Sequence, residues 1–325
     1  MQNVFVLSHA SDIDGVGSAA LVKIKYSIPH SNMLFSDYSK QGLSYADRKL
    51  SRHYKKGITL FIADLGVHPG IVDLYRSILK SVKDGGGKVL WFDHHPWADE
   101  SIKKLTPLCD AAIIGENSKY CATEITYREL GFKDAFTKKF VQIVHYSDFN
   151  IKPKSTAQRK AVATYALSIT SYNSKDSWDE KMADLRHVAE VISKGDLFDS
   201  KVKADAARFD KINRSRTKQM VKALEIRKNV AVGFSKQVQS THGCAAVIDA
   251  SRKKIGIYVN TAVSRGHIRS TGPDISGLAR SLGGGGHPHA SGFDIDRKKF
   301  NGFKTQDDKS KFADFIQARI EKLGI

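Results

Sequence analysis

Short apolar runs alternate with helical patterns over the first 150 residues. The runs that suit strands cover residues 3–7, 58–63, 88–92 and 111–114. Apolar residues at helical spacing occupy residues 17–26, 73–82, 122–130 and 135–146. Such alternation is typical of a parallel sheet covered by helices on both faces. The pattern therefore predicts an α/β fold for this part of the chain.

A mostly helical stretch and a second α/β region follow. Residues 156–228 carry apolar residues at helix-like spacing, and Lys and Arg crowd residues 211–228. Strand-like runs return at residues 230–234, 245–248, 255–259 and 291–295, with helical patterns at 274–282 and 311–323. We therefore predict an N-terminal domain over residues 1–195, a helical connector over 196–229 and a smaller C-terminal α/β domain over 230–325.

The charge of the chain points to an anionic partner. Its 325 residues include 52 Lys and Arg against 34 Asp and Glu, which gives a formal net charge of +18. This excess favours a polyanion such as nucleic acid, although a solvated lysine-rich surface explains the same number. An apolar fraction of 41% excludes a disordered chain.

The sequence has no pattern typical of membrane or secreted proteins. No apolar run reaches the roughly 18 residues that a membrane span requires, and the first run is too short for a secretory signal. The three cysteines, Cys109, Cys121 and Cys244, are widely spaced and form no C-x-x-C pair. We therefore expect a cytoplasmic protein without a membrane partner, a disulfide scaffold or a cysteine zinc site.

Histidines and carboxylates follow three of the predicted strands. The groups are His9, Asp12 and Asp14, then Asp64, then Asp93, His94 and His95, and Asp148 ends a later helical pattern. A helix cap or a solvated loop explains any one group alone. Together they reach one edge of the sheet, where open α/β sheets bind ligands, and gathered carboxylates repel one another unless a cation neutralises them. Asp and His without Cys favour manganese or magnesium over structural zinc.

A dinucleotide-binding fingerprint overlaps the first of these groups. Gly15, Gly17 and Ala20 match G-x-G-x-x-A after a strand, with Asp37 at a suitable distance. Carboxylates in the glycine turn would repel a pyrophosphate, and the fingerprint leaves the paired histidines unexplained. We therefore do not favour the binding of a dinucleotide cofactor such as NAD.

Four consecutive glycines precede His287 in the C-terminal region. A helix that ends at Leu282 needs only Gly283 as its terminating residue. The further glycines, Gly284, Gly285 and Gly286, favour a backbone that approaches a phosphate or a base edge closely.

The ordered motifs resemble one family. D-x-D-G, a strand-end Asp, D-H-H-P, a later Asp and G-G-G-G-H resemble the DHH phosphoesterases with a DHH-associated C-terminal domain. That family includes RecJ-like exonucleases, nanoRNases and cyclic-dinucleotide phosphodiesterases, and the resemblance covers nearly the whole chain. It implies two α/β lobes with the active site in the cleft between them and a pair of Mn²⁺ ions, or Mg²⁺, in the N-terminal lobe.

The resemblance also implies a role for each motif residue. His9 and Asp12 would bind one ion, Asp14, His94 and Asp148 the other, and Asp64 would bridge both. His95 would face the scissile phosphate, and Asp93 would orient a histidine. His9 departs from the pattern, because in many relatives this histidine lies one residue further from the aspartate pair.

The C-terminal motifs would bind the substrate. The glycine loop with His287 would hold the substrate end, and Arg269 with Ser270 fits the place of a phosphate-binding arginine, with Arg265 as a nearby competitor.

We therefore predict a two-metal phosphodiesterase of the exonuclease type that hydrolyses single-stranded DNA or RNA, short oligonucleotides or dinucleotides to mononucleotides. A phosphodiesterase for cyclic di-AMP or pApA is the alternative with the same centre. A non-catalytic nucleic-acid-binding subunit is a third hypothesis, which the full set of ligand types disfavours. A pyrophosphatase or polyphosphatase ranks low, because such relatives usually have a different C-terminal domain.

Overall fold

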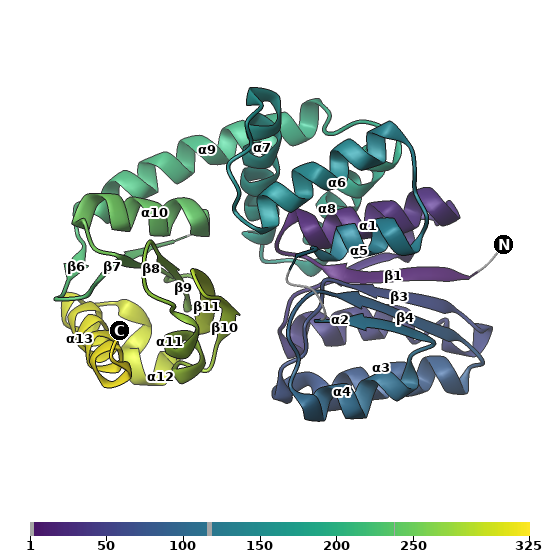
Figure 1. The fold of residues 1–325 in the computed structure, drawn as a ribbon, viewed down its shortest axis with the longest axis horizontal. Helices are drawn as coiled ribbons and strands as arrows, with labels where there is room; N and C mark the ends of the chain where they lie inside the picture. Colours follow the sequence, from purple (N-terminus) through teal and green to yellow (C-terminus); the bar gives the residue numbers. More distant parts are fainter. Residues whose placement is uncertain (1–2, 116–118, 237) are drawn as a thin grey trace. The chain divides into compact units, whose positions relative to one another are not determined.

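The computed structural model describes residues 3–115, 119–236 and 238–325 (Figure 1). By its internal contacts the chain divides into two compact units, Met1–Ala207 and Arg208–Ile325. Helix α9 (Ser200–Val221) runs across this division. The predicted α/β class is confirmed, with a parallel sheet in the first unit and a smaller α/β second unit. No helix among the described residues is long and apolar enough to cross a membrane.

The first unit is built on a parallel sheet whose strand order reverses once. The strands are β1 (Val4–His9), β2 (Met33–Ser36), β3 (Thr59–Ala63), β4 (Lys88–Asp93) and β5 (Ala111–Ile114). Their spatial order is β2-β1-β3-β4-β5, and every pairing is parallel. The chain goes from β1 to β2 on one side and crosses back to β3 on the other. The carboxyl ends of β1 and β3 therefore form a topological switch point, where open α/β sheets bind ligands.

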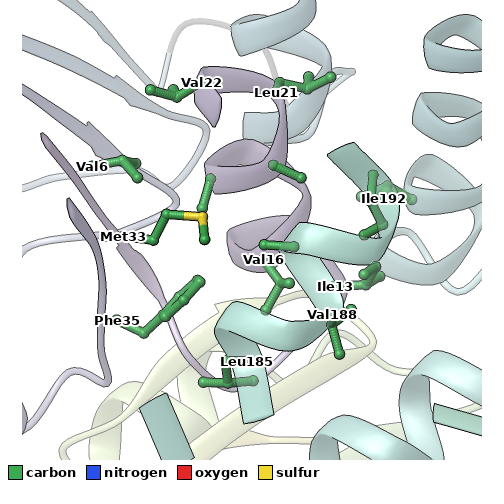
Figure 2. Packing of buried hydrophobic residues seen from close by; sticks show 14 of the residues in the cluster. Val6, Ile13, Val16, Leu21, Val22, Met33, Phe35, Leu185, Val188 and Ile192 are labelled. Atoms are coloured by element: carbon green, nitrogen blue, oxygen red, sulfur yellow. The ribbon is translucent and has the colours of Figure 1, made fainter. Parts of the chain in front are cut away.

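Helices cover both faces of this sheet (Figure 1). One face carries α1 (Ile13–Tyr26), α5 (Ala122–Glu129), α6 (Ala135–Asp148) and α8 (Trp178–Ser193), and α7 (Thr156–Asn173) packs against α6 and α8. The other face carries α2 (Lys40–Leu50), α3 (Val72–Asp84) and α4 (Asp99–Leu105). Figure 2 shows Val16 of α1 and Leu185 of α8 packed near Met33 and Phe35 of β2. This packing fixes α1, and with it the turn that joins β1 to α1.

The second unit contains a mixed sheet of order β10-β11-β9-β8-β7-β6. Its strands are β6 (Glu225–Ile226), β7 (Val230–Ser235), β8 (Ile255–Asn260), β9 (Arg265–Ser270), β10 (Gly285–His287) and β11 (Ala290–Asp294). Only the β7–β8 pair is parallel among these described strands. Helix α10 (Ser240–Ser251) packs on one face, and α11 (Ser276–Ser281), α12 (Arg297–Phe300) and α13 (Gln306–Leu323) pack on the other side.

Two expectations about local structure were wrong. Residues 245–248 were expected to form a strand, but they lie inside α10. The buried residues Gly243, Cys244 and Val247 have helical spacing, and a short apolar run cannot by itself distinguish a buried strand from a helix. Strands β2 and β9 were not expected either, because β2 has four residues and β9 has little apolar character.

Candidate metal centre

The structure brings the predicted strand-end residues together at the switch point. β3 pairs with β1 through Ala63 and Ser8, and with β4 through Ala63 and Phe92. The next residues in this register are His9, Asp64 and Asp93. Because the three strands are adjacent and parallel, these side chains reach one edge of the sheet.

His94 lies at the centre of three carboxylates. Its Nε2 is 3.6 Å from Oδ1 of Asp64 and 3.8 Å from Oδ2 of both Asp14 and Asp148. These distances are too long for direct hydrogen bonds. Donor atoms about 2.0–2.2 Å from one ion lie about 3–4 Å from one another, so the spacing fits ligands of a shared cation. Asp14, His94 and Asp148 form one such group, and Asp64, His94 and His95 form a second.

Asp64 has two properties that a structural role does not explain. Its backbone is in the left-handed region, with φ of 56°, which is uncommon for a residue other than glycine. Its Oδ2 atom is buried and has no hydrogen-bond partner among the described residues. Burial, followed by the charges of Asp14, Asp12 and Asp148, raises the pKa of Asp64 well above its usual value. A cation beside Asp64 would offset the cost of keeping this carboxylate charged while it is buried among other carboxylates.

Asp148 occupies a similar environment at the end of α6. Its Oδ2 is also buried without a hydrogen-bond partner in the described part of the chain. Burial and the nearby carboxylates Asp14 and Asp12 raise the pKa of Asp148 well above its usual value. Unpartnered carboxylate oxygens around an imidazole fit a hard divalent cation such as Mn²⁺ or Mg²⁺.

Asp14 has a structural role that was not predicted from the sequence. Its two carboxylate oxygens accept the backbone N–H groups of Ala122, at 2.8 Å, and Thr123, at 2.7 Å. Its main-chain carbonyl accepts the hydroxyl of Thr123 at 2.7 Å. Asp14 therefore joins α1 to the N-terminus of α5, whose dipole favours a negative charge. This contact holds the carboxylate in place facing His94.

Asp12 caps the N-terminus of α1. A helix cap was one of the two alternative explanations that the sequence left open for these carboxylates. The Oδ1 atom of Asp12 accepts the N–H groups of Asp14, at 3.1 Å, and Gly15, at 3.2 Å. Its Oδ2 lies 3.6 Å from Nε2 of His9. The cap thus occupies one oxygen, and the other lies beside His9.

The glycines of the dinucleotide fingerprint have packing roles. A Cβ on Gly15 would lie 2.1 Å from the carbonyl oxygen of His9, and a Cβ on Gly17 would lie 2.9 Å from Oγ1 of Thr123. Both positions therefore require glycine for close approach of protein atoms. This accounts for the motif without a pyrophosphate.

His95 is held by Asp93. Its Nδ1 lies 2.8 Å from Oδ1 of Asp93, and the indole N–H of Trp97 donates to the other oxygen at 2.7 Å. Burial opposes the charge on Asp93, but His95 and Trp97 outweigh it and lower the Asp93 pKa. Burial likewise opposes the charge on His95, but Asp93 outweighs it and raises the His95 pKa to about 9. Asp93 therefore lies where it can orient a cationic His95.

Tyr38 is a site residue that was not predicted from the sequence. It follows β2, its hydroxyl is 3.4 Å from Nε2 of His95, and its ring centroid is 4.5 Å from that of His9. The Nε2 of His68 lies 3.0 Å from the Tyr38 carbonyl oxygen. The only sequence signal for Tyr38 was its place after a short apolar segment, 33–35, that was not recognised as a strand.

In the second unit, Arg269 and His287, two of the predicted substrate residues, share one face of the sheet. Arg269 on β9 is opposite Ala290 on β11, which is opposite His287 on β10. Residues directly opposite in register point to the same side. Arg269 Nη2 donates to Oγ1 of Thr241 at 2.9 Å. The N–H of the neighbouring Ser270 donates to the carbonyl of His289 at 3.2 Å.

The two candidate arginines differ in their partners. Arg265 forms an ion pair with Asp294 at 3.2 Å. Arg269 forms no ion pair with a carboxylate in the described residues, and burial lowers its pKa. A partly buried guanidinium without an acidic partner suits an anionic ligand better than a paired one.

The four glycines divide into three roles. Gly283 ends α11 with φ of 78°, as a terminating glycine does. A Cβ on Gly284 would lie 2.0 Å from the carbonyl oxygen of Gly292, and one on Gly286 would lie 2.6 Å from that of Ala290. Gly285 is exposed, and a Cβ there would contact nothing within 4 Å. The backbone conformation explains Gly283 and packing explains Gly284 and Gly286, which leaves Gly285 without a structural requirement for glycine.

No family model and no curated protein matches this chain, but several solved structures share its fold. RecJ from Thermus thermophilus in complex with Mn²⁺ has a TM-score of 0.54 and 13% identity, over 96% of this chain and 52% of that protein. The pGpG-specific phosphodiesterase PggH from Vibrio cholerae has a TM-score of 0.52 and 16% identity, over 97% of this chain and 99% of that one. A manganese-bound exonuclease RecJ has a TM-score of 0.52 and 12% identity, over 96% and 90%. The resemblance expected from the five motifs is thereby confirmed at the level of the fold.

Proposed function

We propose that this chain, which has the fold of the DHH phosphoesterases, is a metal-dependent phosphodiesterase acting on nucleotides. The observation that carries the proposal is the arrangement of three carboxylates, two buried and one partly buried, around Nε2 of His94, at 3.6–3.8 Å. Asp14, His94 and Asp148 would hold one ion, and His9 and Asp12 a second. Asp64 would contact both.

Each part of the centre has a chemical task in this proposal. Two divalent cations held by these residues would supply an activated water and would neutralise the charge of the phosphate group. His95, held by Asp93, presents a cationic imidazole beside the metal ligands and can donate a hydrogen bond to a phosphate oxygen. Arg269 and the exposed backbone of Gly285 are proposed to hold the anionic end of the substrate.

Single-stranded nucleic acid is the substrate class that the charge favours. A polymer is attracted by an extended basic surface, whereas a small dianion needs only a few cations. The net charge of +18 therefore supports a polymeric substrate, which we propose is cleaved by an exonuclease to mononucleotides. A dinucleotide phosphodiesterase is a second candidate, because PggH, a pGpG-specific enzyme, matches this chain over 99% of its own length.

A substrate panel tests the proposal. The protein with Mn²⁺ is incubated with end-labelled single-stranded DNA, long RNA, a 5′-phosphorylated dinucleotide and cyclic di-AMP, at about 50 and 200 mM salt. An exonuclease is expected to release mononucleotides from a long strand, with an activity that falls steeply as salt rises. Cleavage confined to the dinucleotide or to cyclic di-AMP would select the second candidate. No hydrolysis of any substrate would contradict both.

Replacing Arg269 by Ala is expected to weaken substrate binding and to leave the metal content unchanged. Loss of one charged hydrogen bond costs about 1.5–3 kcal/mol, which corresponds to a rise in KM of roughly ten- to hundredfold. Steady-state kinetics and metal analysis of the same preparation measure both quantities. Arg265→Gln is the matched control, since Arg265 is already paired with Asp294. An equal rise in KM for the two variants would contradict the proposal that Arg269 binds the substrate phosphate.

A further inference from the structure

A groove of about 420 Å³ lies between α5 and α6 in the first unit. Three tyrosines and two cations line it, namely Tyr120, Tyr127, Tyr146, Arg128 and Lys138. The volume is within the range of small-molecule sites. Tyrosine rings with Arg or Lys form the lining that binds single-stranded nucleic acids, because bases stack on the rings and phosphates bind the cations.

The groove begins beside the metal centre. His145 lines it and precedes Asp148 by three residues on α6, which is about 4.5 Å along the helix axis. The ring of Phe149 lies near both the groove and the metal centre, with its centroid 4.8 Å from that of His145 and 6.1 Å from that of His94. Lys138 lies ten residues before Asp148, about 15 Å along α6. The lining thus extends along α6 from Tyr146, two residues before Asp148, to Lys138, a length of about 12 Å that corresponds to about three stacked nucleotides at about 3.4 Å each.

Arg128, one of the two cations of the groove, is available to an anion. The Arg128 guanidinium lies 3.9 Å from the ring centroid of Tyr120. It forms no ion pair with any residue that the structure describes. The acidic residue of the groove is Glu124, whose Oε2 already lies 2.8 Å from Nδ1 of His145 and accepts the N–H of Cys121 at 2.9 Å. Arg128 is therefore held by an aromatic ring and keeps its N–H groups for a ligand.

Tyr146 is the best-placed ring for a base. Tyr120 and Tyr127 pack partly against the core of the first unit. Tyr146 does not belong to that cluster, and it is half-buried in the groove. Its partly exposed ring is therefore the one of the three on which a base can stack without disturbing the core.

We infer that the α5/α6 groove binds the nucleotides of a single strand that lie beyond the scissile linkage. In this subsite a base stacks on Tyr146, and a phosphate binds Arg128. The inference rests on the proposed function and makes it more specific. A substrate that occupies this subsite must be an oligonucleotide of several nucleotides, because a dinucleotide held at the metals is too short to fill the groove as well.

Binding of two ligands tests the subsite. The affinities of a phosphorothioate oligo(dT) hexamer and of the corresponding dinucleotide are measured for the wild type, Tyr146→Ala, Tyr146→Phe and Arg128→Gln. Lys139→Gln is the matched control, since Lys139 is exposed on α6 and does not line the groove. The ratio of hexamer to dinucleotide affinity is expected to fall about tenfold in Tyr146→Ala and Arg128→Gln, in keeping with the loss of one stacked base or one phosphate contact. It should stay within about twofold of wild type in Tyr146→Phe and Lys139→Gln, because the ring stacks without its hydroxyl.

The outcomes separate this inference from the proposed function. A wild type that binds both ligands, with a ratio that neither Tyr146→Ala nor Arg128→Gln changes, overturns the subsite and leaves the phosphodiesterase intact. If the ratio of hexamer to dinucleotide affinity falls equally in Tyr146→Ala and Tyr146→Phe, base stacking on the Tyr146 ring is excluded as the cause of the fall. A wild type that binds neither ligand overturns both proposals.

Discussion

Asp64→Ala protein is expected to bind fewer Mn²⁺ ions than the wild type and to lose at least about a thousandfold in kcat, or about 4 kcal/mol. The reason is that Asp64 is proposed as the one carboxylate in contact with both ions, so its removal weakens both at once. Metal analysis after gel filtration and hydrolysis of the preferred substrate measure the two effects. Asp73→Ala, on the exposed first turn of α3, is the matched control.

The stability of a second variant at this position, Asp64→Asn, distinguishes a ligand from a structural carboxylate. Without metal, burial and the neighbouring carboxylates Asp14 and Asp148 disfavour the charged form of Asp64, and one of its oxygens has no partner among the described residues. Replacing Asp64 by a neutral side chain removes this cost. Asp64→Asn, which tolerates the left-handed backbone better than Ala, is therefore expected to unfold in chelator at a temperature no lower than wild type. Added Mn²⁺ should raise the Tm of the wild type but not that of Asp64→Asn. Full activity and two bound ions in both variants would refute the bridging role.

Asp14→Ala is expected to destabilise the first unit far more than Asp12→Ala, even when chelator removes metal from both proteins. Asp14 accepts two buried N–H groups at the start of α5, and each unsatisfied group costs about 1–3 kcal/mol. Allowing for relieved repulsion from Asp64 and Asp148, we expect a loss of about 2–4 kcal/mol. Asp12 caps a helix and is partly exposed, so its loss costs about 1 kcal/mol.

Thermal unfolding in chelator measures this difference. For a unit of this size, about 2–4 °C is lost per kcal/mol. Asp14→Asn keeps one acceptor oxygen and should lie between Asp14→Ala and wild type. Equal shifts for Asp12→Ala and Asp14→Ala would show that the contact with α5 contributes little. Asp14 would then act as a ligand alone.

Strand ends could be predicted from the sequence because parallel sheets impose a simple rule. Apolar runs preceded Asp64 and Asp93, and the carboxyl ends of parallel strands meet at one edge. This rule was enough to group His9, Asp64 and His94 without knowing the strand order. It was not enough to find Tyr38, because β2 is only four residues long and falls below the length at which periodicity is informative.

Long-range contacts could not be predicted from the sequence. Asp14 and the α5 backbone are 108 residues apart, and no local pattern marks an N–H group as the partner of a distant carboxylate. Trp97 is close to Asp93 in sequence, but its N–H contact depends on how the chain turns after β4. The glycine run was similarly ambiguous, since only the packing of β10 against β11 separates Gly285 from Gly284 and Gly286.

The central claim is that this protein is a metal-dependent phosphodiesterase. It is tested most directly by removing the metal with a chelator and measuring hydrolysis as Mn²⁺ is restored. The wild type is stripped of metal and assayed on a 5′-phosphorylated dinucleotide and a single-stranded oligonucleotide while Mn²⁺ is added stepwise. We predict no product without metal, and an activity that rises with Mn²⁺ until two ions are bound per chain. Hydrolysis at an undiminished rate in the stripped protein, or saturation with Mn²⁺ without any product, would contradict the account.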